Sequence, residues 1–122
     1  MRRAMVLCSL AVLVIAGCAK HSMYGDREFA QKVVEAVYAG SLAPIQTNLS
    51  PTIGLDDAWA QKMSDTLKPE FGAIKEVKLN SFGQKKDDLQ EVIWTVTTEN
   101  STFLMQLMWN KDDKVQSIQF NY

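Results

Sequence analysis

The second half of the chain alternates apolar and polar residues, and this alternation constrains the fold more than any other feature. It predicts four strands, at about residues 74–82, 89–98, 101–109 and 114–122. Turn-prone segments separate these strands, at residues 83–88, 99–100 and 112–113. Because short connections join strands that run in opposite directions, the sequence predicts a four-stranded antiparallel meander.

Pairing each hairpin outward from its turn predicts the register, and a slip of one residue would move every side chain to the other face. The expected pairs are Leu79–Val92 and Val77–Trp94 in the first hairpin, Val96–Phe103, Trp94–Met105 and Val92–Leu107 in the second, and Leu107–Ile118, Met105–Phe120 and Phe103–Tyr122 in the third. These pairs share one apolar face. The opposite face is mixed, with Ile93, Leu104 and Met108 among polar residues.

Two helical segments open the folded part. Asp26 is expected to cap a helix in which Phe29, Val33 and Val37 recur every four residues, and Gly40 is expected to end it after Ala39. Ser41 is then expected to cap a short helix around Pro44, with Ile45 and Leu49 facing inward.

A third helix is expected to begin at Asp56 and Asp57, whose carboxylates suit the free N–H groups of a helix start. Trp59, Met63 and Leu67 form its apolar stripe. Pro69 is expected to stop the helix at Lys68, because the residue before a proline avoids the helical conformation.

The helices need an apolar surface, and the apolar face of the sheet provides one. We therefore expect a single α+β domain at residues 26–122, with the N-terminal helices on one face of a curved four-stranded antiparallel meander. The Gly40–Ser41 break, Trp59, the Phe71–Gly72 step and the last strand resemble the nuclear transport factor two-like cone fold, especially small secreted or lipidated bacterial members without an assigned function. A cystatin-like sheet wrapped on one helix is the alternative.

Residues 1–17 have the parts of a secretory signal: Arg2 and Arg3, an apolar run, and small residues at its end. The run is shorter than the roughly 20 residues of a membrane-spanning helix. Its end, Ile15-Ala16-Gly17-Cys18, resembles the lipobox of bacterial lipoproteins. The resemblance implies cleavage between Gly17 and Cys18, a diacylglycerol thioether on Cys18, and usually an acyl chain such as palmitate on the new amino group. An ordinary signal peptide with an incidental cysteine is the alternative.

Residues 18–25 would then be a lipidated tether that brings the domain to the membrane. Ala19 stands where Asp would resemble the inner-membrane retention signal. The implied location is the cell envelope, on the outer membrane facing the periplasm if the host has two membranes. Cys8 lies in the signal, so Cys18 is the one cysteine expected in the mature chain, and no disulfide is expected.

The chain shows no pattern for catalysis, metal or cofactor binding. Its net charge of −1 argues against nucleic acid as a partner. Phosphate-binding, nucleophile-elbow and zinc motifs are missing from the sequence, and the one histidine, His21, lies in the tether. Enzymes of the cone superfamily place an acidic or histidine base inside the cone, but the expected apolar face carries none. We expect a protein that is not an enzyme and uses no cofactor.

Two functions remain as hypotheses. In the first, the domain is an interaction module that pairs with itself or with another envelope protein through Ile93, Leu104 and Met108. In the second, the domain carries or senses a small apolar ligand in a pocket between helices and sheet. The expected lining of that pocket is Trp59, Trp94, Met105 and Phe120, although the same residues suit a filled core.

Overall fold

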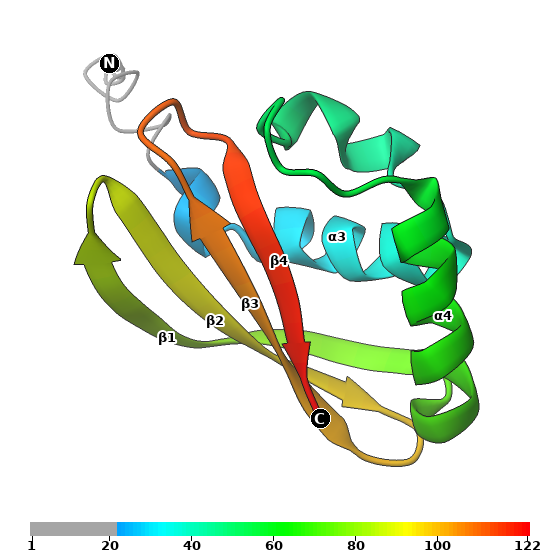
Figure 1. Ribbon diagram of the computed structural model, residues 1–122. Helices are drawn as coiled ribbons and strands as arrows, with labels where there is room; N and C mark the ends of the chain where they lie inside the picture. The colour runs from blue at the N-terminus through cyan, green and yellow to red at the C-terminus, as the bar shows by residue number, and fades with distance from the viewer. Residues whose placement is uncertain (1–21) are drawn as a thin grey trace, which may run out of the picture.

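A computed structural model describes residues 22–122 (Figure 1). Its elements, in chain order, are the 3₁₀ helix η1 (Ser22–Gly25), helix α3 (Arg27–Ala39), the 3₁₀ helix η2 (Ala43–Asn48), helix α4 (Asp57–Phe71), and strands β1 (Ile74–Lys86), β2 (Leu89–Thr98), β3 (Thr102–Trp109) and β4 (Val115–Asn121). The predicted signal, its cleavage site, Cys18 and His21 lie outside the described residues.

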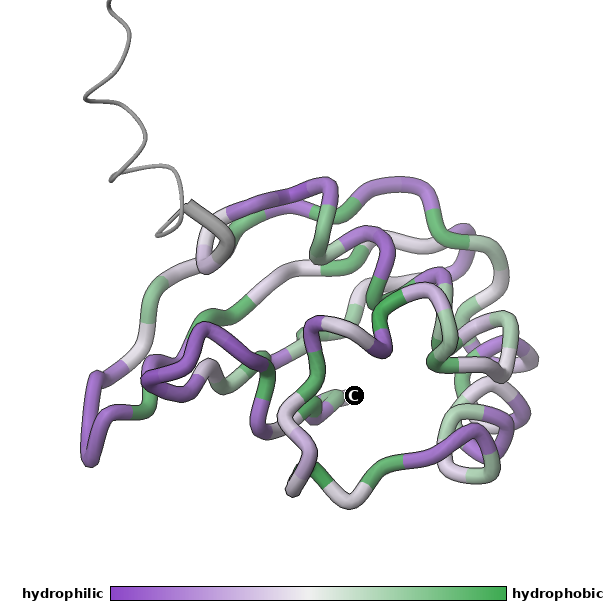
Figure 2. The backbone as a smooth tube through the Cα atoms, turned by 90° about the horizontal axis from the view of Figure 1, so that it is seen from above, coloured by the Kyte–Doolittle hydropathy of each residue, from purple (hydrophilic) through white to green (hydrophobic). Residues whose placement is uncertain are grey.

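The four strands form one antiparallel sheet in the order β1-β2-β3-β4, and the helices lie on one face of this curved sheet (Figure 1). The predicted α+β class, the meander and the one-sided helical layer are therefore confirmed. We call the face covered by helices the inner face and the opposite one the outer face. Figure 2 shows hydrophobic and hydrophilic residues interspersed along the backbone of the domain.

Helix α3 begins and ends as predicted. The Asp26 carboxylate accepts hydrogen bonds from the backbone N–H groups of Glu28 and Phe29, at 2.9 and 3.3 Å. The helix ends where Gly40 adopts a left-handed conformation with φ of 76°, which costs glycine little because it has no Cβ. Phe29 and Val33 are among the residues that α3 buries in the core.

The short helix after Gly40 differs from its prediction in type and cap. η2 is a 3₁₀ helix whose first flanking residue, Leu42, provides no side-chain cap. Ser41 Oγ accepts instead from the N–H of Ala43 at 3.3 Å, while the Leu42 N–H donates to the Asp57 carboxylate at 2.8 Å. Ile45 is buried, as expected.

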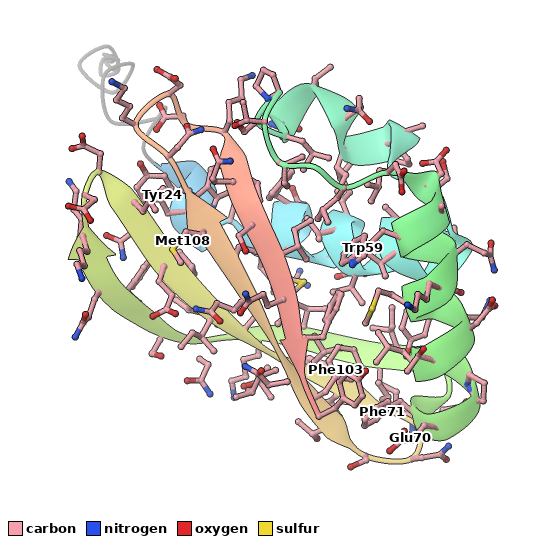
Figure 3. All side chains as sticks on the ribbon, in the orientation of Figure 1. Tyr24, Trp59, Glu70, Phe71, Phe103 and Met108 are labelled. Carbon is pink, nitrogen blue, oxygen red and sulfur yellow. The ribbon has the colours of Figure 1, made fainter. Side chains whose placement is uncertain are left out.

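The prediction that α4 ends at Lys68 is wrong, because the helix continues through Pro69 to Phe71. A proline lacks one N–H and therefore removes one helical hydrogen bond. The added turn compensates by burying Phe71, whose ring centroid lies 5.0 Å from that of Phe103 (Figure 3). The N–H of Gly72 closes the helix on the Lys68 carbonyl at 2.9 Å.

The second hairpin has the predicted register, including Val96–Phe103, Trp94–Met105 and Val92–Leu107. The third hairpin contains Leu107–Ile118 and Met105–Phe120, as predicted. Its last pair is Leu104–Asn121 and β4 ends there, so Tyr122 lies beyond the ladder and the expected Phe103–Tyr122 pair does not form part of it.

The predicted register of the first hairpin is wrong by two residues: Leu79 pairs with Trp94, and Val77 pairs with Val96. Asp87 and Asp88 both have positive φ, at 52° and 65°, and form a tight turn, so β1 continues to Lys86. The β1–β2 ladder has three register shifts, which accommodate the residues by which β1 is longer than predicted. Because the shift is two residues, Val77 and Leu79 keep their predicted face.

The core lies between the inner face and the helices α3 and α4. Sheet residues that it buries include Val77, Val92, Trp94, Val96, Phe103, Met105, Leu107 and Ile118. Three residues predicted for this face lie at its margin: Phe120 is half-buried, Leu79 is 40% exposed and Tyr122 is 61% exposed.

Candidate interaction surface and aromatic groove

The three apolar residues predicted on the outer face form one cluster. Ile93 on β2 pairs with Gln106 on β3, and Leu104 and Met108 flank Gln106 two residues away in each direction along β3. Residues two apart in a strand share a face, and diagonal neighbours across a ladder lie within reach of long side chains. Ile93, Leu104 and Met108 are all half-buried around Gln106. We call these four residues the outer cluster.

The surroundings of the outer cluster are polar but almost uncharged. Its cross-strand neighbours are Ser81, Thr95, Ser117, Gln119 and Asn121, together with Glu91 opposite Met108. Glu91 is the single charged residue in β2, β3 and β4, whereas β1 contains five. Depletion of charge at the centre with hydrogen-bonding groups around it is typical of protein interfaces.

The structure separates the four residues predicted to line an inner pocket. Trp94 and Met105 are 1% and 0% exposed and belong to the core. Trp59 and Phe120 are half-buried, and their rings stack with centroids 6.2 Å apart and an interplanar angle of 16°. The four residues therefore do not line a common pocket: two fill the core, and two lie at its edge.

Trp59 and Phe120 line an open groove between α4 and β4, with a volume of about 390 Å³. Met63 from α4 and Ile118 and Tyr122 from the C-terminal strand region complete its apolar lining. Sequence periodicity placed Trp59 and Met63 on the stripe of α4, but it could not show that this stripe meets the last strand rather than the middle of the sheet.

A second groove, which the sequence did not indicate, has a volume of about 520 Å³ and lies between α3, the end of α4 and the start of β1. Tyr38 contributes to its wall, and the Tyr38 hydroxyl donates to the Gly72 carbonyl at 2.9 Å. Burial raises the pKa of Tyr38. The residues that line this second groove come from elements far apart in the sequence, so no local motif indicates it.

Neither groove assembles a catalytic constellation. The Tyr38 hydroxyl already donates to a backbone carbonyl, and the nearby Lys68 amine is 3.4 Å from the Tyr38 carbonyl oxygen. Within residues 22–122 no group of three or more histidine, cysteine or acidic residues is placed to hold a metal ion. No helix in that range is long and apolar enough to cross a membrane.

Comparison of the sequence with models of protein families and with curated proteins finds no match in either case.

Proposed function

We propose that the protein is a lipid-anchored component of the bacterial envelope whose folded domain is a non-enzymatic interaction module. In this proposal two copies pair through their outer faces. The observation that carries it is the outer cluster, in which Ile93, Leu104 and Met108 surround Gln106 on strands whose single charged residue is Glu91. The lipobox-like Ile15-Ala16-Gly17-Cys18 supports the anchor.

A second copy is the occupant that this face suits best. In a two-fold symmetric dimer each surface meets its own copy, so a charged centre would meet the same charge and repel it. The outer cluster avoids this conflict because Gln106 is neutral and its amide can both donate and accept hydrogen bonds. Ile93, Leu104 and Met108 then add apolar contact around this amide.

The size of the face predicts weak pairing. Strands about 4.8 Å apart, with about seven residues that each rise about 3.3 Å, give a face of roughly 450 Å² for four strands. Two faces would bury roughly 900 Å², less than the roughly 1,200–2,000 Å² of stable interfaces. Anchoring on a shared membrane raises the effective concentration of the copies, and this compensates for low affinity.

Sedimentation of residues 20–122 over a wide concentration range tests the proposal. The apparent mass should rise with concentration, and Leu104→Glu should weaken the association at least tenfold, which corresponds to about 1.4 kcal/mol. The loss is expected because the variant places a carboxylate in a contact that excludes water. Ser101→Glu adds the same charge at an exposed turn position and should leave the association unchanged.

A mass that stays monomeric at all concentrations would contradict pairing between copies. An equal effect of Leu104→Glu and Ser101→Glu would assign the association to overall charge rather than to the outer cluster. If a different protein binds and only Leu104→Glu abolishes that binding, the outer cluster remains the interaction surface. The partner is then that protein rather than a second copy.

The groove between α4 and β4 supports a second candidate function, the carriage of a small apolar ligand. The stacked Trp59 and Phe120 rings provide an open aromatic wall that a flat or alkyl group could contact. Native mass spectrometry of protein purified from its host, without refolding, tests this function. A reproducible added mass that Trp59→Ala removes would support it, and a bare protein would count against it.

A further inference from the structure

The far half of β1 exposes two large apolar side chains on the inner face. Leu79 is 40% exposed and Phe82 is 55% exposed. They pair with Trp94 and Val92, whose side chains are buried, so the ladder places all four on the same face. Figure 1 shows this end of the sheet extending beyond α3 and α4. Leu79 and Phe82 therefore lie where the helical layer stops.

The start of the folded domain lies beside these two residues. A Cβ atom added to Gly25 of η1 would be 3.3 Å from the Phe82 ring. η1 is held in place by Tyr24, whose hydroxyl donates to the Asp113 carboxylate at 3.2 Å and whose ring lies 5.4 Å from that of Trp109. The described part of the chain therefore begins beside Phe82.

The covalent distance to the expected lipid is short. Cys18 precedes Ser22 by four residues, which can span at most about 14 Å. A lipid on Cys18 would thus bring η1, and Phe82 beside it, to the membrane surface. An exposed aromatic side chain next to a membrane anchor suits the boundary between headgroups and acyl chains.

At the docking end of β1, Lys85 and Lys86 provide two positive charges, and Asp87 and Asp88 follow at the turn. Lysines near a membrane are attracted to anionic headgroups. Lysines on an edge strand also block pairing between sheets, but that role does not require Leu79 or Phe82 to be exposed.

We infer that the segment Leu79–Lys85 of β1 is a membrane-docking surface, in which Leu79 and Phe82 contact the lipid boundary and Lys85, opposite Gln90 on the same face, contacts phosphate groups. The inference rests on the proposed lipid anchor at Cys18. It sets the orientation of the domain: the β1 end lies on the membrane, and the turn between β2 and β3, at the other end of β2, points away from it.

The test uses the full chain, lipidated in a bacterial host and reconstituted in vesicles of zwitterionic and anionic phospholipids that contain spin-labelled lipid. Since Cys18 would carry the lipid, a cysteine introduced at Gln84 or at Ser101 provides a single thiol for a fluorophore. Both positions are exposed, and they lie roughly 30 Å apart along the sheet. The label at residue 84 should be quenched at least threefold more strongly than the label at residue 101.

Matched variants assign the quenching to the two apolar side chains. Replacing Leu79 and Phe82 together by serine should reduce quenching at residue 84 to the level at residue 101, while the protein stays on the vesicles through its lipid. Tyr122→Ser, which removes the exposed aromatic residue at the other end of the domain, should change neither signal. Circular dichroism of each variant checks that it is folded.

Equal quenching at the two positions, in a protein whose mass shows lipid on Cys18, would overturn the docking surface and leave the anchor intact. A protein without that lipid would overturn both. Quenching at residue 84 that depends on protein density rather than on spin-labelled lipid would overturn the inference by assigning Leu79 and Phe82 to contact between copies.

Discussion

Leu104 and Leu107 lie three residues apart on β3 and represent the two faces of the sheet. Leu107 is 1% exposed and pairs with Val92 and Ile118, which are also buried. Leu104 is only half-buried and pairs with Thr95 and Asn121. Leucine therefore packs in the core on one face and is accessible to a partner on the other. The cause is the helical layer, which covers only the inner face.

The largest expected effect is a difference in the free energy of unfolding between substitutions on the two faces. Leu107→Ala should lower the free energy of unfolding by about 2–5 kcal/mol, because it leaves a cavity in the core. Leu104→Ala removes the same atoms from a half-exposed site and should lower it by less than about 1 kcal/mol. Urea unfolding of both variants, followed by circular dichroism, measures the difference. Equal losses would contradict the assignment of the two faces.

A smaller effect is expected at Trp94, within the inner face. The Trp94 indole N–H is buried and has no hydrogen-bond partner, as is also the case for Trp109. Trp94→Phe removes this unpaired donor along with some packing volume, and the two changes partly offset each other. We expect the free energy of unfolding to fall by less than about 1.5 kcal/mol in the same urea assay. A loss above about 3 kcal/mol would show that the N–H is bonded in the folded protein.

The smallest effect is expected where η1 meets the end of the inner face. Burial raises the pKa of Tyr24 above its ordinary value of 10.0, and the hydrogen bond to Asp113 and its negative charge raise it further. The unfolded chain therefore loses this proton first as the pH rises. The contribution of Tyr24 is complete below pH 10 and is lost as the pH rises through the higher pKa of the folded state.

Tyr24→Phe should thus make the decrease in stability above pH 10 shallower. Tyr38, whose pKa burial also raises, contributes the same trend to both proteins. Thermal unfolding between pH 8 and about 11 compares the two slopes. Identical slopes would show that Tyr24 does not contact Asp113 in solution, and η1 would then lose its proposed role in placing the tether beside Phe82.

Much of the fold could be predicted because, in the second and third hairpins, the strand pattern and the turn position imply the same register. The two-residue turn at Glu99–Asn100 fixes the second hairpin, and its register follows from the sequence. The first hairpin could not be predicted in the same way, because Asp87 and Asp88 form a tight turn inside a segment that resembles a longer loop. At Pro69, tertiary burial of Phe71 outweighs the local preference to end the helix.

Of the two candidate surfaces, the outer cluster could be predicted from the sequence and the groove between α4 and β4 could not. Alternation alone places Ile93, Leu104 and Met108 on one face, and the ladder adds that they surround Gln106. The aromatic groove could not be predicted, because it depends on where α4 crosses the edge of the sheet. Alternation along the strands identifies Trp94, Met105 and Phe120 as inward-facing, and the helical stripe does the same for Trp59. Neither pattern distinguishes a filled core from an open wall.

The central claim, that two copies meet through their outer faces, is tested most directly in the membrane. Gln106→Cys places a thiol at the centre of the outer cluster, where a two-fold dimer brings each residue close to its copy. Mild oxidation of envelopes that contain this variant should give a disulfide-linked dimer, and Ser101→Cys in the exposed turn should give much less. Equal crosslinking at both positions, or none at Gln106, would contradict the pairing.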